Sequence, residues 1–491
     1  MTLQLDISYW QLALMALDYG IKFVMIGVVP SNRRPSSANA WLLLILLLPV
    51  VGLPLYLMMG SAYVSRRRHR IQQLAKAELE NVHVDVPDSP AGSQLSDELE
   101  SMVRLNRTLT GFPAVHAHVR HLWADYEMTI MRIATLIDSA QQYVDIEIYA
   151  VAWDDTTDRV FRAIERAVQR GVHVRLLYDH IGSLKYPGYR RLRRRLRDIG
   201  VDYHRMLPLD LFRSRWRRPD LRNHRKVIII DGQVGMLGSI NLIDRTYLTR
   251  RHVRAGRKWV DAFVELEGPI VTSLESMFAV DWYTESGELI NLEPPADLIG
   301  VRDDANVVQL VPSGPGYQAE PNLRMFNTLM HHARERLILC SPYFVPDDTL
   351  LEAITTACYR GVRVDLLVGE RADQFMVQHA QSSYYQQLLE AGVRIWEFPA
   401  PYVLHTKFAL ADPGLASSVG VMGSSNMDMR SFTLNYENSL FICRGPLLGQ
   451  LHDLSLAYFA VSRQLTLERW SQRPWHRRYI DNVMKLTSAL Q

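Results

Sequence analysis

The sequence predicts a duplicated α/β protein that is held in a membrane by its N-terminal part. Two observations indicate this fold class. An uncharged run at 42–59 is long enough to cross a bilayer core, and two later segments, 144–206 and 337–398, repeat the same order of strands and helices. Each repeat is followed by the same short motif of histidine, lysine and aspartate.

The composition limits the classes of protein to which the chain can belong. A chain of 491 residues corresponds to roughly three domains of about 150 residues each, and 48% hydrophobic with 22% charged residues excludes a disordered protein. The net charge of +3 argues against a protein that binds polyanions through bulk charge. Cys340, Cys358 and Cys443 are too few for a disulfide framework or a four-ligand zinc site, which favours a reducing compartment and predicts no structural metal.

We expect residues 1–70 to form a membrane anchor with two transmembrane helices, at about 10–30 and 41–60. The second is the uncharged run. The first contains Asp18 and Lys22, which are four residues apart and can pair on one helix face, so an amphipathic helix lying in the membrane interface is the alternative. The arginines at 66–68 and 70 predict that both termini and the catalytic domain are cytoplasmic, and that the 31–40 loop lies outside.

Residues 71–110 read as a linker, because prolines and glycine at 87–92 interrupt any helical period. Two domains follow, at 111–295 and 296–491. In the first, a β-branched run at 144–151 leads to a helical pattern at 161–170 and a further apolar run, and the second repeats this order from 337 to 369. Such β-α-β units predict parallel strands.

The most informative signal is the spacing H-x-K-x4-D, which occurs once in each repeat: His224, Lys226 and Asp231, then His405, Lys407 and Asp412. The chain has only seven lysines, so finding two of them in the same motif at matching places is not an accident of composition. In an extended strand, residues two apart share a face, so each His and Lys should point the same way while Arg225 and Thr406 point away.

A second strand end in each repeat adds hydroxyl and amide groups, from Ser239 and Asn241 in G-S-I-N and from Ser424 and Asn426 in G-S-S-N. We expect these four residues to bind and orient the substrate phosphate. Two histidines can supply a nucleophile and a proton donor, and two lysines can hold phosphoryl oxygens. This set predicts transfer at a phosphodiester without a metal or cofactor. We expect Asp231 and Asp412 to form structural salt bridges rather than to move protons.

These paired motifs resemble the phospholipase D superfamily, and with the N-terminal helices the chain is similar to the bacterial cardiolipin synthases. The resemblance extends over nearly the whole chain and includes, besides the motifs, Arg34, Pro35 and Trp41; Trp259 and Asp261; Glu267, Gly268 and Pro269; Ser313, Gly314 and Pro315; residues 428–432; and Asn435, Tyr436 and Glu437. It implies two pseudo-symmetric repeats, each a mixed β-sheet flanked by helices.

The resemblance further implies that His224 attacks phosphorus to form a phosphohistidine and that His405 is the general acid and base. It assigns Asp261 to orient His224 and Glu437 to orient His405. The implied reaction converts two phosphatidylglycerol molecules to cardiolipin and glycerol in the bacterial inner membrane, without nucleic acid as a partner, and it leaves a homo-oligomer possible.

Other interpretations remain open at this stage. A hydrolytic phospholipase or a nuclease could use the same scaffold, although membrane helices disfavour the nuclease, and a catalytically silent lipid-binding protein is disfavoured by two intact motifs. The arginine-rich stretch 213–222 favours contact with lipid headgroups, whereas the one at 190–197 is equally typical of a solvated helix face. The C-terminal stretch 470–486 fits either a bilayer surface or a packed terminal helix.

Overall fold

The computed structural model describes residues 9–31, 35–60, 70–71, 73–75, 77, 86–209, 218–291, 305–317 and 319–486. The chain divides into an N-terminal helical unit and a large unit that contains both repeats. Each unit is described by itself.

The N-terminal unit has one helix of membrane-spanning length, α1 (Tyr9–Val28), followed by two short apolar helices, α2 (Pro35–Leu47) and α3 (Pro49–Met59). The prediction of one continuous helix at 41–60 is therefore wrong. Pro49 has no amide hydrogen to continue α2 and instead begins α3, after Leu48 leaves the helical conformation. Gly52 fits directly against the backbone of Leu44 and Ile45, where a Cβ atom would lie 2.7–2.8 Å away.

As predicted, Asp18 and Lys22 pair on one face of α1, at 2.7 Å. A second crossing of the membrane stays a prediction, because helices of 13 and 11 residues are each shorter than the roughly 20 residues a bilayer core requires. The arginines at 66–68, on which the orientation depends, lie outside the described residues.

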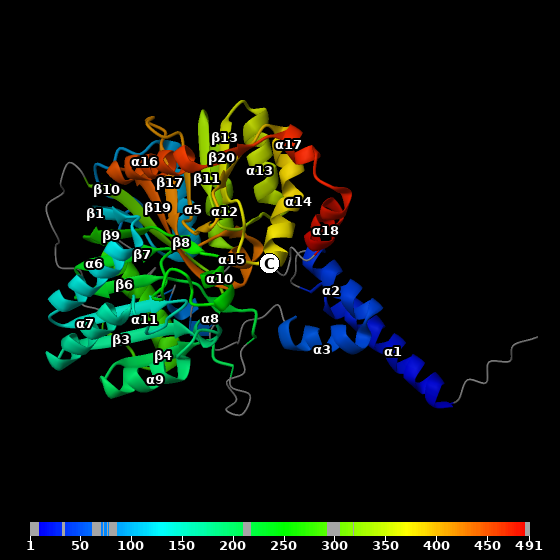
Figure 1. The fold of residues 1–491 in the computed structure, drawn as a ribbon, viewed down its shortest axis with the longest axis horizontal. Coiled ribbons are helices and arrows are strands. Elements are labelled where there is room, and N and C mark those ends of the chain that lie inside the picture. The colour runs from blue at the N-terminus through cyan, green and yellow to red at the C-terminus, as the bar shows by residue number, and fades with distance from the viewer. Residues whose placement is uncertain are drawn as a thin grey trace, which may run out of the picture. The chain divides into compact units, whose positions relative to one another are not determined.

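The large unit is built on one mixed sheet of 16 strands, with helices on both faces (Figure 1). Fifteen strands form a continuous order, and the sixteenth is the two-residue strand β5 (Arg222–Asn223), which pairs beside that order. The first half of this sheet contains β1 (Ala114–Trp123), β2 (Tyr143–Ile148), β3 (His173–Asp179), β4 (Asp202–Met206), β6 (Val227–Ile230), β7 (Val234–Gly238) and β9 (Phe263–Glu267). The second half contains β10 (Asn306–Ser313), β11 (Arg336–Cys340), β13 (Arg363–Gly369), β14 (Arg394–Phe398), β16 (Phe408–Ala411), β17 (Val419–Gly423), β19 (Asn435–Arg444) and β20 (Arg463–Leu465).

The strand order runs β4-β3-β2-β6-β7-β9-β1 through the first half and β10-β19-β17-β16-β11-β13-β14-β20 through the second. In both halves the three strands of the predicted β-α-β units are parallel and the motif strand beside them is antiparallel, as in a mixed sheet. The halves join where β1 pairs antiparallel with β10. The two repeats thus share one continuous sheet.

Helices pack against this sheet through alternating faces of its strands. On one face, α6 (Tyr126–Ser139), α7 (Asp158–Gln169) and α9 (Tyr189–Asp198) cover the first half, and α12 (Pro321–His332), α13 (Asp348–Tyr359) and α14 (Phe375–Ala391) cover the second. On the other face, α11 (Ile270–Ser286) and α16 (Pro446–Val461) share a core with both halves. Val144 and Ile146 of β2 thus face a different core from Val227 and Ile229 of β6.

The segment predicted as a linker contains a well-formed helix, α5 (Asp97–Thr110), so that prediction is wrong for 97–110. The Ser96 hydroxyl accepts a hydrogen bond from the Leu99 amide and caps the helix. Buried Gln309 of β10 then fastens α5 to the second repeat. Its amide donates to the carbonyls of Val103 and Phe112, at 3.0 and 2.8 Å, and its oxygen accepts from Asn106 at 3.1 Å.

We predict that Gln309→Ala lowers the free energy of unfolding by about 2–4 kcal/mol, because it leaves several buried polar groups without partners. Urea unfolding of the purified protein in detergent, followed by tryptophan fluorescence, measures the change. The matched control is Gln386→Ala, since Gln386 is exposed on α14 and contacts Glu390 one turn away. Equal stability of the two variants would contradict the role given to Gln309.

Candidate active site

The two motif segments lie immediately before sheet strands rather than inside them. His224 and Lys226 follow the two-residue strand β5 (Arg222–Asn223) and precede β6, and His405 and Lys407 follow β15 (Tyr402–Leu404) and precede β16. Each short strand pairs in parallel with a strand of the other repeat: β5 with the start of β19, and β15 with β8 (Lys258–Val260). The main chain of each motif is therefore held across the boundary between the repeats.

Each histidine also takes its carboxylate partner from the other repeat. The Nδ1 atom of His224 lies 2.9 and 3.0 Å from the two carboxylate oxygens of Glu437, and Nδ1 of His405 lies 2.6 Å from Oδ1 of Asp261. The predicted pairing, Asp261 with His224 and Glu437 with His405, is wrong. The backbone contacts explain the exchange, because the His224 amide donates to the Tyr436 carbonyl and the His405 amide to the Val260 carbonyl, next to these acids.

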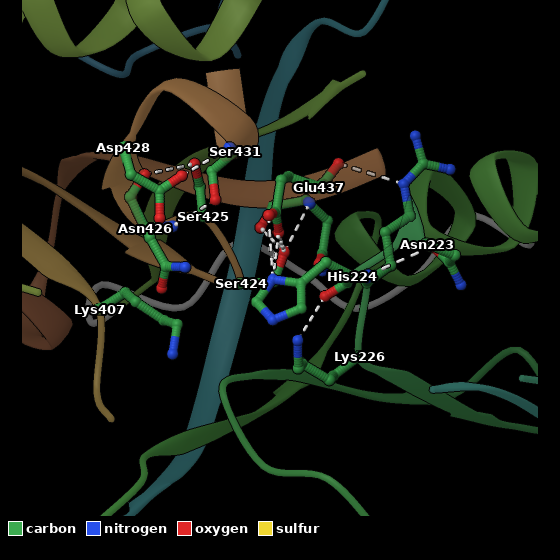
Figure 2. Close-up of polar contacts among 12 residues, drawn as sticks. Asn223, His224, Lys226, Lys407, Ser424, Ser425, Asn426, Asp428, Ser431 and Glu437 are labelled. Atoms are coloured by element: carbon green, nitrogen blue, oxygen red, sulfur yellow. Dashed lines mark hydrogen bonds and ion pairs between the residues drawn. The ribbon is translucent and has the colours of Figure 1, made fainter. Parts of the chain in front are cut away.

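Two of the four predicted phosphate ligands serve these carboxylates instead. The Ser239 hydroxyl donates to Oδ1 of Asp261 at 2.7 Å, and the Ser424 hydroxyl donates to Glu437. Figure 2 shows Ser424, Glu437 and the His224 ring in one connected group. The serines thus orient the acids, which in turn orient the imidazoles.

The two asparagines differ from one another. Asn241 accepts a hydrogen bond from the Ala150 amide at 3.0 Å and donates to the Tyr247 hydroxyl at 2.7 Å, so it braces the structure around the site. Asn426 is turned toward Lys407 (Figure 2). From this position its amide could donate to a phosphoryl oxygen held by that lysine.

Both lysines are buried beside the histidines. Each Nζ donates to the backbone carbonyl of its own motif histidine, and Lys226 also lies 5.4 Å from the centre of the Tyr149 ring. Burial lowers the pKa of Lys226 well below its ordinary value and lowers the pKa of Lys407 to about 8. An anionic phosphate entering this space would stabilise the charged ammonium groups.

The residues between His and Lys point away from the site, as predicted, into the protein interior. Arg225 forms a buried ion pair with Asp281 of α11, and its Nε donates to the Glu437 carbonyl at 3.1 Å. Thr406 instead contacts the Tyr458 hydroxyl at 2.9 Å.

The motif aspartates bind backbone amides, and no ion pair between the described residues includes either of them. Asp231 accepts hydrogen bonds from the amides of residues 141–143, and Asp412 accepts from those of residues 334–336. The predicted structural role is thus correct, but the predicted salt bridges are wrong. Each carboxylate caps the turn that leads into the neighbouring parallel strand, β2 or β11.

The two histidine–acid pairs differ in their electrostatics. Burial and the nearby charges of Lys226 and Lys407 lower the pKa of His224 well below its ordinary value. Burial raises the pKa of Glu437 to about 7. Burial alone would raise the pKa of Asp261, but the charge and hydrogen bond of His405 outweigh burial and lower that pKa. Burial and the charge of Lys407 lower the pKa of His405 as well, while the charge and hydrogen bond of Asp261 oppose that shift. Both pairs therefore favour a neutral imidazole, but only at His405 does the partner carboxylate act against the lowering of the pKa.

Sequence reasoning missed two aromatic residues beside the histidines. The Tyr149 ring lies 5.0 Å from the His224 ring, and the Tyr247 ring lies 6.4 Å from the His405 ring. Tyr149 directly follows β2, whose end lies beside the motif strand, so its place after a predicted parallel strand was a usable signal.

The arginine-rich stretch predicted to bind headgroups lies outside the described residues at 213–217. At its end, Arg218 pairs with Asp220 at 2.5 Å, and Arg222 is buried and pairs with Asp179 at 3.1 Å. Since Asp179 also accepts from the Asn223 amide, Arg222 fixes the approach to His224, and its predicted headgroup contact is wrong.

Comparisons with known proteins agree with this geometry. Residues 133–282 and 326–454 match the family model described as "Cardiolipin synthase, PLD-like domain", and residues 22–60 match "Phospholipase_D-nuclease N-terminal".

Relatives and a solved structure extend over most of the chain. The chain is 33% identical to cardiolipin synthase A of Serratia proteamaculans over 98% of its own length and 97% of that protein, and 32% identical to cardiolipin synthase A of Proteus mirabilis over 94% of each. The fold is similar to that of phosphatidylserine synthase from Haemophilus influenzae, with a TM-score of 0.57 at 16% identity over 79% of this chain and 99% of that one. This chain therefore belongs to the cardiolipin synthase family of the phospholipase D superfamily.

Proposed function

We propose that the protein is a phosphatidyltransferase that converts two phosphatidylglycerol molecules to cardiolipin and glycerol through a phosphohistidine. The observation that carries this proposal is the pair of buried histidines, each with Nδ1 held by a carboxylate. This contact directs Nε2 of each ring to the reaction. The family membership supports the same chemistry.

In the first half-reaction, Nε2 of His224 attacks the phosphorus of one phosphatidylglycerol. A P–N bond forms, the P–O bond to the headgroup glycerol breaks, and His405 gives its proton to the departing oxygen. In the second, His405 takes a proton from the terminal hydroxyl of another phosphatidylglycerol, whose oxygen attacks phosphorus and releases His224. Lys226 and Lys407 hold the phosphoryl oxygens throughout.

The unequal surroundings of the two pairs support this assignment of roles. A nucleophile must be neutral, which is favoured by the pKa of His224, lowered well below its ordinary value. A general acid must carry a proton, and at His405 the charge and hydrogen bond of Asp261 oppose the lowering of the pKa by burial and Lys407. Burial of both rings also limits the access of water, which would otherwise compete with the lipid hydroxyl and give phosphatidate.

Incubation of the purified protein with phosphatidylglycerol in detergent tests the proposal. We expect a four-chain lipid and free glycerol in equal amounts. Because one phosphodiester replaces another, added glycerol should drive the same enzyme backwards, from cardiolipin to phosphatidylglycerol. Phosphatidate as the main product would show a hydrolase, and no product at all would show a lipid-binding protein.

A substrate with a good leaving group separates the two histidine–acid pairs. With phosphatidyl-p-nitrophenol, nitrophenolate departs without a proton, so Asp261→Asn and His405→Ala should release it at rates near wild type. Glu437→Gln and His224→Ala should release it about 10²–10⁴-fold more slowly, because they impair the nucleophile itself. Stopped-flow absorbance measures the release. Release near the wild-type rate by Glu437→Gln, together with slow release by Asp261→Asn, would reverse the roles assigned to His224 and His405.

The lysines should set the alkaline limit of activity. Their folded-state pKa values are lowered, so the charged form is present at low pH and is lost as pH rises, for Lys407 through about 8. We expect kcat/KM, which reports the free enzyme, to fall from pH 8 or below. The combined variant Lys226→Arg with Lys407→Arg keeps both charges, so its profile should extend to higher pH even if its activity is lower. An identical alkaline limb in this variant would exclude the lysines as its cause.

We also propose that the anchor crosses the inner membrane more than once and leaves the catalytic unit in the cytoplasm, which the arginines at 66–70 support. In a Cys358→Ser background, a membrane-impermeant thiol reagent should label Ser36→Cys in intact cells but should label Ala91→Cys, at an exposed position, only after permeabilisation. Labelling of Ala91→Cys in intact cells would place the catalytic unit outside.

A further inference from the structure

Three segments that are distant in the sequence place exposed apolar and basic side chains around one acidic residue, Asp373. They are the end of α8 (His180–Leu184), the helix α10 (Arg250–Arg254) and the start of α14. We call this surface the rim and define it by Leu184, Arg251, Val253, Arg254, Phe375 and Met376, all of which are exposed. The side chain of Val253 is 55% exposed and that of Phe375 is 59% exposed.

A hydrogen bond and the charge of Asp373 connect these segments. The Asp373 charge acts on Lys185, next to α8, and on His252 of α10, raising the pKa of each against the larger effect of burial. Arg257, just after α10, donates to the Ala372 carbonyl at 3.3 Å. The rim is therefore one surface.

A chain of aromatic rings connects the rim to the active site. His252 of α10 lies 4.9 Å from Trp259, Trp259 lies 4.4 Å from Tyr247, and Tyr247 lies 6.4 Å from His405. On the other side, Asp373 also acts on the pKa of Tyr149, whose ring contacts His224. The rim thus lies at the surface end of the aromatic side chains that lead to the two motif histidines.

The C-terminal helix α18 (Trp475–Lys485) continues this surface. Its inner face is fixed by buried Asp481, which contacts His379 of α14 and Arg473, each at 2.6 Å, and the His379 ring lies 4.4 Å from Phe375 of the rim. Its outer face exposes Trp475 (73%) and Tyr479 (64%), which lie one turn apart on one stripe beside exposed Arg478.

We propose that the rim and the outer face of α18 form a second membrane-binding surface, which rests on an anionic bilayer and lets lipid pass into the active site. This inference rests on the proposed function, since its benefit is the delivery of phosphatidylglycerol. The mixture of side chains favours a bilayer over a protein partner. Protein interface cores are depleted in charge, whereas here arginines flank Val253 on α10 and lie beside the exposed aromatic residues of α18. Trp, Tyr and Arg together are typical of a lipid headgroup layer.

The surface can be located in the intact protein with an environment-sensitive fluorophore. Full-length Cys358→Ser protein carrying Val253→Cys, Phe375→Cys or Tyr479→Cys is labelled and placed in nanodiscs of phosphatidylcholine with phosphatidylglycerol. The matched control is Tyr359→Cys. Tyr359 is 77% exposed, but it ends α13 and precedes β13, whereas Asp373 follows β13, so the control lies at the other end of that strand from the rim. Lipid-borne doxyl groups and aqueous iodide serve as quenchers.

We expect doxyl lipid to quench the three surface labels at least about twofold more than the control, and iodide to quench them less. The contrast should weaken in nanodiscs of phosphatidylcholine alone. Labels that respond to iodide and not to doxyl lipid would show a surface in water, and labels protected from both would show a surface covered by protein. Either result overturns the inference.

An activity measurement checks the purpose of the surface separately. The double variant Val253→Asp with Phe375→Asp should lower the ratio of activity on phosphatidylglycerol vesicles to activity on a monomeric short-chain analogue about tenfold, while Tyr359→Asp should leave that ratio unchanged. An unchanged ratio in the double variant would overturn the role in lipid delivery. If wild type instead makes phosphatidate, the proposed function fails, and the quenching data still decide whether the surface binds lipid.

Discussion

The arrangement of the candidate active site depends on two carboxylate–imidazole contacts that cross the boundary between the repeats. Each contact is buried, so the acid and the ring would be costly to desolvate without one another. Backbone pairing of β5 with β19 and of β15 with β8 brings the partners together, and the continuous sheet through β1 and β10 keeps the two halves in register. A motif strand within its own repeat would lack the acid that selects its reactive nitrogen. The pairing of each acid with its imidazole is therefore a property of the joined repeats.

Behind the catalytic strands the two halves are unlike. The first has a buried charged group, in which Arg225 pairs with Asp281 and supports the Glu437 carbonyl, whereas the second has the neutral contact of Thr406 with Tyr458. Charges in a dry interior act over longer distances than at the surface. The half that presents His224 is thus embedded in a different field from the half that presents His405, although both carry the same motif.

Much of the fold and of the candidate site could be predicted from local sequence patterns. Strand and helix periods predicted the repeated β-α-β units, and the identical motif spacing predicted which residues meet. The exchange of Asp261 and Glu437 could not be predicted, because it depends on how one repeat lies against the other, and no local pattern records that. Two wrong predictions concerned elements whose sequences do contain a local signal. Pro49 marked the break between α2 and α3, and the buried positions of α5 have a helical period after the Ser96 cap. The binding of Asp231 and Asp412 to backbone amides was hidden for another reason, since an amide partner leaves no trace in the side-chain sequence.

The crossed contacts have the geometry of an isologous dimer, in which the same surface of two copies gives each to the other. Here both copies belong to one polypeptide, so the halves always meet at a one-to-one ratio, without the entropy loss of association. Joining the two copies in one chain also allows their sequences to differ. Two identical subunits must present two identical imidazoles, and either could begin the reaction. A single chain can change one acid from aspartate to glutamate and one backing residue from threonine to arginine, and so give the two rings separate tasks.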